Sequence, residues 1–318
     1  MTTPGLFDSP LPPIRARLER KLQELAGQNI LIGTSSWKYE GWLGQVFTGD
    51  RYVTRGKFSR KKFEENCIAE YAEVFPIVCG DFAFYQFPTP AFWQKLFTAA
   101  PPQLRWAFKV PEEITVKQWP GHARYGARAG LENENFLNAD LFRHAFLAAL
   151  APYRERVSVL IFEFGNLSKK TMPDLDAFLT QVNRFLSELP EGWRYSIELR
   201  NPEFLAPDYF ACLRSYNVAH VLNAWSGMPE IGLQLQMDDI FTADFAVVRA
   251  LLKYGRTYES AVKSFEPYRA VQEENPGARD ALKAILARAK RIRQPAFVFV
   301  NNRLEGNAPG TIDAITEV

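Results

Sequence analysis

The sequence predicts a single (β/α)8 barrel of the TIM type, an α/β fold, because eight short β-type runs alternate with helical segments along the 318 residues. Several runs are apolar at consecutive positions, as at 159–162 and 297–300, which is typical of parallel strands buried on both faces. Three connections that follow strands are long, at 37–59, 111–138 and 250–277, whereas most connections after helices are short. Strand-to-helix loops of a barrel share its C-terminal face, so this extra length is expected where barrel active sites lie.

The N-terminal segment precedes the alternating pattern. Twelve residues rich in proline and glycine form a loose arm, and Pro13 then suits the first position of a helix. Apolar residues follow at helical spacing up to Gly27. We therefore expect an N-terminal arm and helix at 1–28 and one barrel domain at 29–318.

The eight predicted strands are 30–35, 77–85, 104–110, 157–164, 195–199, 218–223, 245–249 and 296–301. Helices are predicted between them at 61–74, 91–100, 139–150, 173–189, 207–215 and 278–292. The last strand should pair with the first and close the barrel. A doubly wound sheet is the alternative, but the sequence contains neither GxGxxG nor GxxxxGK[ST].

Composition excludes several functional classes. Lysine and arginine total 38 against 36 acidic residues, a net charge of +2, which argues against a strongly basic nucleic-acid coat. The three cysteines are far apart and suggest neither a disulfide framework nor a CxxC metal site. Without an apolar stretch of membrane-spanning length or a signal-peptide core, we expect a cytoplasmic protein with no membrane partner.

Charged residues lie inside or at the ends of otherwise apolar strands. They are Lys109, Glu163, Glu198, Arg200 and Arg249. An unpaired buried charge is costly, so these side chains should face one another at the barrel mouth. Two interpretations stay open: a structural ion-pair network, or a polar pocket whose carboxylates have shifted pKa values. Glu163 lies between two phenylalanines, and a one-residue change of register would turn it outward.

Metal and nucleophile sites have weaker support. HExxH is absent, and Asp81, Glu163 and Glu198 are a candidate hard-cation set only if the nearby cations do not oppose it. We therefore expect no metal and no cofactor. There is no GxSxG elbow. His144 and His220 are expected to be structural, and His122 lies in a glycine-rich basic loop at 121–130 that either cradles an anion or is simply solvated.

A basic segment at 51–62 contains six lysines and arginines, with Ser59 as a predicted N-cap for the next helix. Three cations in that first helical turn oppose the helix dipole. The segment is either an anion site or a solvated charged loop. Trp37 and Trp42 precede it and could present rings to a sugar or base, although packing is the common use of such residues.

The strand-end motifs together resemble the DUF72 family, the YecE/YunF-like proteins, from about residue 32 to 308. The matching elements are IGTSSW at 32–37 with Trp42 and Gly44, FYQFP at 84–88, FKVP at 108–111, ELR at 198–200, Arg249, and NN at 301–302 with Gly306 and Ala308. Cys79, Val116 and Asn201 stand where many members have glutamate or histidine. The resemblance implies a TIM-type barrel and a site at the strand ends, and implies no particular reaction.

The leading functional hypothesis is an enzyme that acts on a small anionic or sugar-like metabolite at the C-terminal barrel mouth. Glu198 and Glu163 would transfer protons. Substrate would be held by Lys109, Arg200, Arg249, Asn301, Asn302, Tyr85, Ser35 and Trp37. Three cations against two carboxylates leave one excess positive charge, so we expect an anion to complete the cluster. The alternative is a non-catalytic protein that binds nucleic acid or another anionic partner through 51–62, Trp37 and Trp42.

Overall fold

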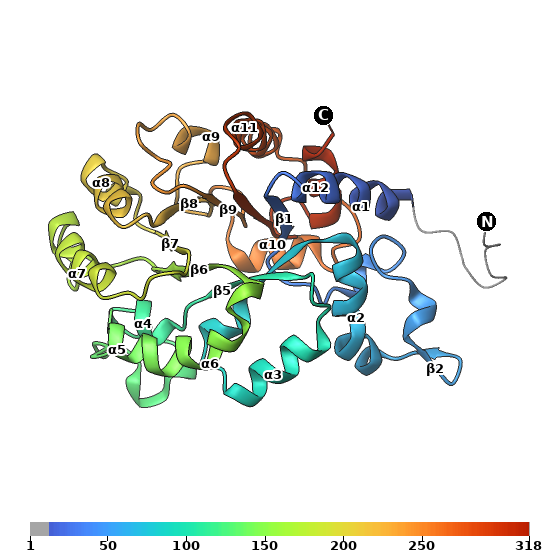
Figure 1. The fold of residues 1–318 in the computed structure, drawn as a ribbon, viewed down its shortest axis with the longest axis horizontal. Coiled ribbons are helices and arrows are strands. Elements are labelled where there is room, and N and C mark those ends of the chain that lie inside the picture. The colour runs from blue at the N-terminus through green and yellow to red at the C-terminus, as the bar shows by residue number, and fades with distance from the viewer. Residues whose placement is uncertain (1–12, 318) are drawn as a thin grey trace.

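Eight parallel strands close into a barrel in the computed structural model, which describes residues 13–317 (Figure 1). The strands are β1 (Ile30–Thr34), β4 (Ile77–Gly80), β5 (Arg105–Lys109), β6 (Val157–Glu163), β7 (Tyr195–Glu198), β8 (Ala219–Ala224), β9 (Ala246–Ala250) and β10 (Ala296–Val300). The barrel closes as predicted, because β10 pairs with β1 from Ile30 opposite Ala296 to Thr34 opposite Val300. The predicted (β/α)8 fold is therefore confirmed.

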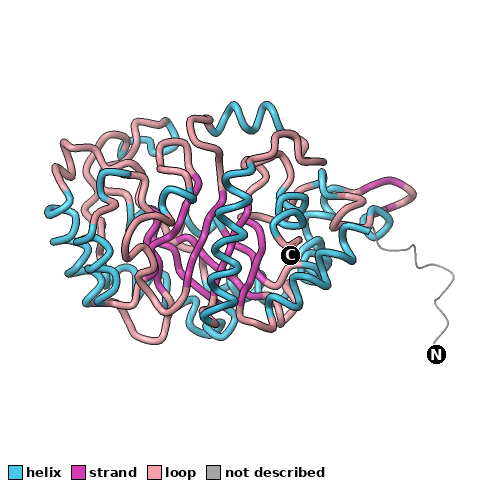
Figure 2. The backbone as a smooth tube through the Cα atoms, turned by 90° about the horizontal axis from the view of Figure 1, so that it is seen from above, coloured by secondary structure: helices cyan, strands magenta, loops and turns pink. Residues whose placement is uncertain are grey.

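Helices surround the strands as an outer ring (Figures 1 and 2). The longer ones are α1 (Pro13–Ala26), α2 (Arg60–Val74), α3 (Pro90–Ala99), α7 (Leu175–Ser187), α8 (Pro207–Ser215), α10 (Tyr258–Phe265), α11 (Pro276–Ile292) and α12 (Ala308–Ile315). The short ones are α4 (Glu112–Thr115), α5 (Ala139–Leu141), α6 (Ala148–Leu150) and α9 (Ile231–Gln234), and a π-helical turn (Phe142–Leu147) joins α5 to α6. The six predicted helices thus have counterparts, with ends that differ by a few residues.

Strand residues alternate between two cores. Side chains such as Val159, Ile161, Val221, Val247 and Phe299 fill the barrel interior. Their neighbours in sequence point outward and pack under the helices in a larger cluster. The strands are therefore buried on both faces, which explains their consecutive apolar residues.

The second strand is shorter than the predicted 77–85. It ends at Gly80, and Asp81–Phe84 form a 3₁₀ turn. A Cβ at Gly80 would lie only 2.8 Å from the rings of Phe82 and Phe108, so the small residue permits this tight packing. The prediction was wrong here because an apolar run continues through the turn and hides the end of the strand.

The N-terminal helix α1 packs against the barrel wall. Leu18, Leu22 and Leu25 are buried, and α1 contacts β1, α2 and α12. Arg15 is buried and pairs with Glu70 of α2 at 2.5 Å. The arm expected at 1–12 lies outside the described residues.

The long loops carry additional structure. The first contains the hairpin β2 (Val53–Thr54) and β3 (Lys57–Phe58), which projects beyond α2 (Figure 1). The third contains α10, which packs on Leu251 and Leu252 just after β9. Both loops follow strands, as the sequence predicted.

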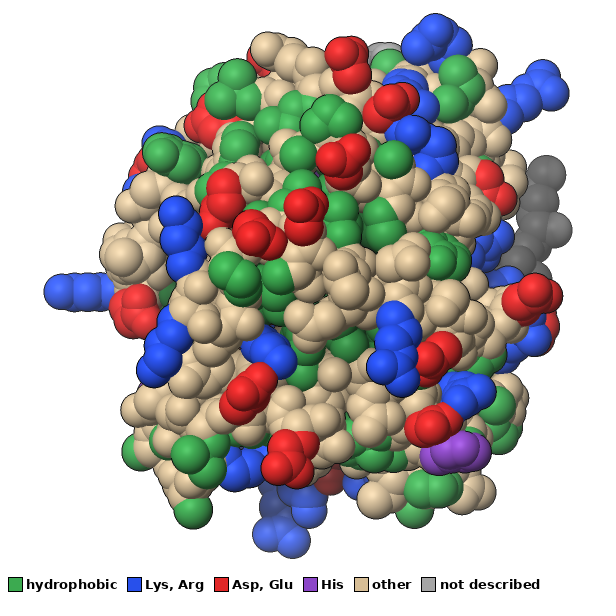
Figure 3. Space-filling view, turned by 90° about the vertical axis from the view of Figure 1, so that its left-hand side faces the viewer, with side chains coloured by type: hydrophobic (Ala, Val, Ile, Leu, Met, Phe, Trp, Pro, Cys, Tyr) green, Lys and Arg blue, Asp and Glu red, His purple; other side chains and the backbone are tan. Residues whose placement is uncertain are grey.

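The outer surface mixes charges of both signs. Figure 3 shows the side that carries α7 and α8, where acidic and basic side chains are interspersed with small hydrophobic areas. No helix among residues 13–317 is long and apolar enough to cross a membrane.

Candidate functional site

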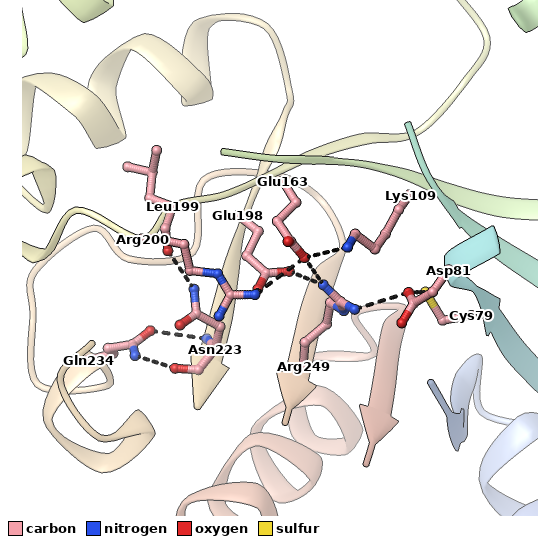
Figure 4. Close-up of polar contacts among 10 residues, drawn as sticks. All are labelled: Cys79, Asp81, Lys109, Glu163, Glu198, Leu199, Arg200, Asn223, Gln234 and Arg249. Carbon is pink, nitrogen blue, oxygen red and sulfur yellow. Dashed lines mark hydrogen bonds and ion pairs between the residues drawn. The ribbon is translucent and has the colours of Figure 1, made fainter. Parts of the chain in front are cut away.

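Five strands bring six charged side chains together at the C-terminal end of the barrel (Figure 4). Arg249 comes from β9, Glu163 from β6, Lys109 from β5, Glu198 and Arg200 from the end of β7, and Asp81 from the turn after β4. We call this set the mouth cluster. Alternate residues of a strand share one face, which explains this convergence. Ala107, Ile161 and Val247 fill the barrel interior, and the charged residues that follow them by two positions point the same way.

Arg249 is the centre of the mouth cluster. Its Nη1 donates to Glu163 Oε2 at 2.7 Å and also to Glu198 Oε2, and its Nη2 donates to Asp81 Oδ1 at 3.2 Å. The planar fork of the guanidinium suits such multiple carboxylate contacts. One arginine therefore joins three carboxylates from three different strands or their ends.

Arg200 and Lys109 complete the cluster from either side. Arg200 Nη2 lies 2.6 Å from Glu198 Oε1 and 3.3 Å from Glu163 Oε2, and its guanidinium carbon lies 3.8 Å from the Trp225 ring centre. Lys109 Nζ lies 3.0 Å from Glu163 Oε2 and 3.7 Å from the Phe84 ring centre. The two aromatic rings help to hold these cations in place.

Asp81 changes the charge balance that the sequence predicted. Counting Asp81 with Glu163 and Glu198 gives three carboxylates against the three cations. The expected excess of one positive charge is therefore wrong. The sequence indicates Asp81 only as a candidate metal ligand, whereas in the structure its carboxylate pairs with Arg249.

Exposure is graded through the cluster. The side chain of Asp81 is 34% exposed and that of Glu163 15%, whereas Glu198 is 0% exposed. The first two carboxylates are therefore within reach of a small molecule at the mouth. Glu198 lies beneath them, between the two arginines, and can position these arginines but not touch a ligand.

The environment keeps Glu163 ionised. Burial raises the pKa of this carboxyl, but the charges of Lys109, Arg200 and Arg249 together outweigh it and hold the pKa well below its usual range. Burial opposes the charged form of Arg249, yet Glu198, Asp81 and Glu163 raise its pKa above the usual value. Glu163 is thus ionised near neutral pH, and the same cations weaken it as a base.

A buried amide pair lies beside the cluster and was not predicted as part of the site. Asn223 Nδ2 donates to the Leu199 carbonyl at 3.0 Å, and Gln234 Nε2 donates to the Asn223 carbonyl at 2.7 Å. The sequence marks Asn223 as a polar strand end. Nothing in the sequence links it to Gln234, which lies eleven residues away on α9.

Several polar atoms of this region lack a protein partner. Arg200 Nη1, Asn223 Oδ1, Arg249 Nε and Ser35 Oγ are buried without a hydrogen bond to any described residue. Such groups are rare in folded proteins because each costs free energy unless water or a ligand satisfies it. Arg200, Asn223 and Arg249 therefore each keep a buried polar atom that no described protein group satisfies.

The closing asparagines have different surroundings. Asn301 follows β10, and its Oδ1 accepts from the Arg303 N–H at 3.0 Å. Asn302 Oδ1 accepts from Trp42 Nε1 at 3.1 Å and from the Ala308 N–H at 2.8 Å. Asn302 thus anchors the first loop and the start of α12, which is a structural arrangement.

Two predicted site aromatics, Trp37 and Tyr85, form no hydrogen bond with the described residues of the mouth cluster. Trp37 is 7% exposed and packs edge-on against Trp106, beside a groove between α2 and α3. Tyr85 follows the 3₁₀ turn, is 58% exposed, and has Arg124 over its ring at 4.7 Å. Tyr85 is therefore a surface residue rather than the strand residue that the sequence predicted.

The alternative binding surface loses its aromatic component. Trp42 is fully buried and Trp37 nearly so, and neither ring face is free to stack on a base. In the basic segment, Arg51 pairs with Glu73 at 2.8 Å and Arg60 with Glu64 at 2.9 Å. The Ser59 cap is present, since its Oγ accepts from the Lys62 N–H. The segment is partly neutralised by its own neighbours.

Ion pairs also order the glycine-rich loop at 121–130. Arg124 pairs with Glu112 at 2.8 Å and Arg128 with Glu113 at 2.9 Å. His122 Nδ1 accepts from the Arg124 N–H, so its ring caps a 3₁₀ turn. These contacts occupy the charged groups that an anion would need.

The other histidines stand where the sequence placed them. His220 is buried on β8 with its Nδ1 3.1 Å from the Tyr209 hydroxyl, and His144 is exposed on the π-helical turn. Within residues 13–317, no group of three or more histidine, cysteine, aspartate or glutamate side chains is arranged to hold a metal ion.

Known proteins share this sequence pattern and fold. The sequence model described as "Protein of unknown function DUF72" matches residues 31–318. A crystal structure of a DUF72 family protein from Thermotoga maritima has a TM-score of 0.58 at 17% identity, covering 90% of this chain and 96% of its own. One from Enterococcus faecalis has a TM-score of 0.56 at 15% identity, covering 91% and 94%. No curated protein sequence is a significant match.

Proposed function

This chain belongs to the DUF72 family, and we propose that it is an enzyme that performs acid/base chemistry on a small polar metabolite at the C-terminal mouth of its barrel. The observation that carries the proposal is the mouth cluster, with its two accessible carboxylates above a buried one. The family assignment supports the barrel fold, and the reaction is inferred from the side chains alone.

Stability alone is a poor reason for this cluster. Taking six charges out of water is expensive, and well-packed apolar residues often replace buried ion pairs without loss of stability. The interior layer immediately below is apolar, so the fold accommodates aliphatic side chains at these strand ends. The charges lie at the end of the barrel where active sites of this fold are built. These facts favour a functional reason for keeping them.

The proposed roles follow from exposure and charge. Glu163, ionised and reachable, accepts a proton from the substrate. The cations that lower its pKa also weaken it as a base, so the bound substrate must draw Lys109 away from this carboxylate for the transfer to occur. Lys109 lies 3.0 Å from that carboxylate and supplies an ammonium group that stabilises negative charge developing on the substrate. Glu198 positions Arg200 and Arg249 without touching the ligand, and Asp81 holds the other end of Arg249.

Balanced charge favours a sugar-like ligand over a strongly anionic one. A dianion entering the mouth cluster would meet three carboxylates and would have to displace at least one from Arg249. A ligand with hydroxyl groups can instead donate hydrogen bonds to the accessible carboxylates of Asp81 and Glu163 without displacing them from Arg249. We therefore propose a small polyhydroxylated carbonyl compound as the substrate class.

The test combines binding with proton exchange. Thermal-shift screening against monosaccharides, ketoses and sugar acids should identify a stabilising compound, and its carbon-bound protons should exchange with solvent in D2O, followed by NMR. Glu163→Gln should slow this exchange at least a hundredfold, the usual minimum for a lost general base. Arg184→Gln, at an exposed position on α7, is the matched control and should keep the parent rate. Exchange that persists in Glu163→Gln would refute the proposed base.

A further inference from the structure

A cavity lies at the N-terminal end of the barrel, opposite the mouth cluster. It has a volume of about 600 Å³ and is lined by residues that open or immediately precede the strands. Arg105 is the first residue of β5, Val157 the first of β6, and Arg194 directly precedes β7. Strand β6 has seven residues, so its two ends lie roughly 20 Å apart. This N-terminal cavity is therefore separate from the mouth cluster.

One side of the N-terminal cavity is basic. Arg105 opens β5, Arg154 lies in the 3₁₀ turn before β6, and Arg194 directly precedes β7; these three strands are adjacent in the barrel. None of the three guanidinium groups forms an ion pair with a carboxylate among residues 13–317, although Arg105 Nη1 donates to the main-chain carbonyl of Glu155, which also lines the cavity. The neighbouring Arg156 has its pKa lowered, first by burial and then by the positive charge of Arg105. Three arginines therefore outnumber the one carboxylate, Glu155, on this side of the cavity.

Two of the arginines, Arg154 and Arg194, contact aromatic rings and backbone rather than carboxylates. Arg194 lies 5.8 Å from the ring centres of Phe245 and Phe297, which close the bottom of the barrel. Arg154 lies 5.8 Å from the Trp193 ring centre and against the backbone of Gly192, where a Cβ would collide with its guanidinium. Gly192 has φ +83°, so only glycine fits both this backbone conformation and the close approach.

The other side of the cavity carries groups that recognise hydroxyls. Asp244 and Asn217 precede β9 and β8, and Asn217 Nδ2 donates to Asp244 Oδ1 at 3.1 Å. Asn29 lies just before β1, which β10 separates from β9 in the ring. The cavity therefore presents three arginines with Glu155 on one side, and Asp244 with two amides on the other.

We propose that this N-terminal cavity is a second ligand site, which binds a small phosphate ester whose remaining part carries hydroxyl groups. Guanidinium forks match the geometry of phosphate oxygens and supply charge-assisted hydrogen bonds. The Asp244 side repels a second phosphate and accepts hydroxyl protons, which selects a monoester over a bisphosphate. A volume of about 600 Å³ lies within the range of small-molecule sites.

The experiment titrates inorganic phosphate and glycerol 3-phosphate against the full-length protein at constant ionic strength, with chloride as the control anion. Both phosphates should raise the unfolding temperature, and the ester should do so at lower concentration. Arg154→Gln and Arg194→Gln should each weaken phosphate binding about tenfold, the effect of losing one charge-assisted hydrogen bond. Arg184→Gln on α7 should bind as the parent does.

Two further variants separate this site from the barrel mouth and from a structural role. Asp244→Asn should tighten inorganic phosphate, because it removes a repelling charge, and should reduce the preference for the ester. Lys109→Gln at the mouth should leave both phosphate titrations unchanged. Phosphate binding that survives in the Arg154→Gln/Arg194→Gln double variant, that disappears in Lys109→Gln, or that is absent from the parent would overturn the proposal. None of these results depends on the reaction proposed for the mouth.

Discussion

Arg249 shows how much of the mouth cluster depends on one side chain. It is 2% exposed and contacts Asp81, Glu163 and Glu198, which come from three separate places in the sequence. Arg200 and Lys109 reach only part of this set. The buried Glu198 has its two oxygens divided between Arg249 and Arg200. Removing Arg249 would leave negative charge with too few partners in a site that water barely reaches.

We predict that Arg249→Met lowers the free energy of unfolding by about 3–5 kcal/mol, the usual cost of breaking a buried ion network on one side. Urea unfolding at neutral pH measures it. Glu198→Gln added to Arg249→Met should recover part of the loss, because it removes one uncompensated charge. Arg184→Met, which breaks an exposed pair with Glu188, should change the value by less than about 1 kcal/mol. A loss below that size in Arg249→Met would mean that the carboxylates do not need it.

His220 supplies a pH dependence at neutral to mildly acidic values. Burial lowers its pKa to about 4, whereas an unfolded histidine titrates near 6.5. Its contribution is therefore fully present above about pH 6.5 and is lost as the pH falls through 6.5 toward 4, with a limiting slope of about 1.4 kcal/mol per pH unit. His220→Gln should flatten the unfolding curve in this window, measured by urea unfolding at several pH values. An unchanged slope would show that other groups dominate there.

At the scale of elements, the helix starts follow local side-chain chemistry. The α2, α7, α11 and α12 helices are capped by Ser59, Asp174, Asn275 and Asn307, whose side chains accept a backbone N–H in the first turn. Such signals are local, and for this reason the sequence predicted Ser59 correctly. The end of β4 was missed because no local signal separates an extended strand from the 3₁₀ turn at Asp81–Phe84.

The cap on α2 should be measurable, because three cations follow it. Ser59→Ala removes the acceptor for the Lys62 N–H and should cost about 1 kcal/mol. Ser59→Asp keeps the acceptor and adds a negative charge at the helix N-terminus, so it should match or exceed the parent by a few tenths of a kcal/mol at low salt. Thermal unfolding of the three proteins compares them. Equal stability of Ser59→Ala and the parent would rule out a contribution from the cap.

For the molecule as a whole, the periodicity of the sequence predicted the fold better than it predicted individual contacts. Apolar strand runs and helix lengths led to the closed barrel, and strand parity led to Lys109, Glu163, Glu198 and Arg249 at one end. If β4 continued to residue 85, strand alternation would point both Asp81 and Tyr85 inward. Because the chain turns after Gly80, Asp81 contacts Arg249 whereas Tyr85 lies at the surface. The arginines of the N-terminal cavity precede strands as ordinary exposed residues, and only barrel closure brings them together.

Closure of the barrel surrounds Glu163 with three cations from other strands, so the stability of the fold depends on whether this carboxyl is ionised. The pKa of this carboxyl is held well below its usual range in the folded protein, whereas the unfolded chain titrates near 4.3. Its contribution is present above the unfolded value and is lost as the pH falls below about 4.5.

We predict that Glu163→Gln is less stable than the parent at pH 7 but loses less stability between about pH 4.5 and 2. Added salt should change the difference little, because the cations around Glu163 are buried. Urea midpoints at several pH values measure both slopes, with the exposed Glu188→Gln as a control that should parallel the parent. Parallel curves for Glu163→Gln and the parent would mean that the three cations do not hold this carboxylate ionised, and would remove the basis for its role as a proton acceptor.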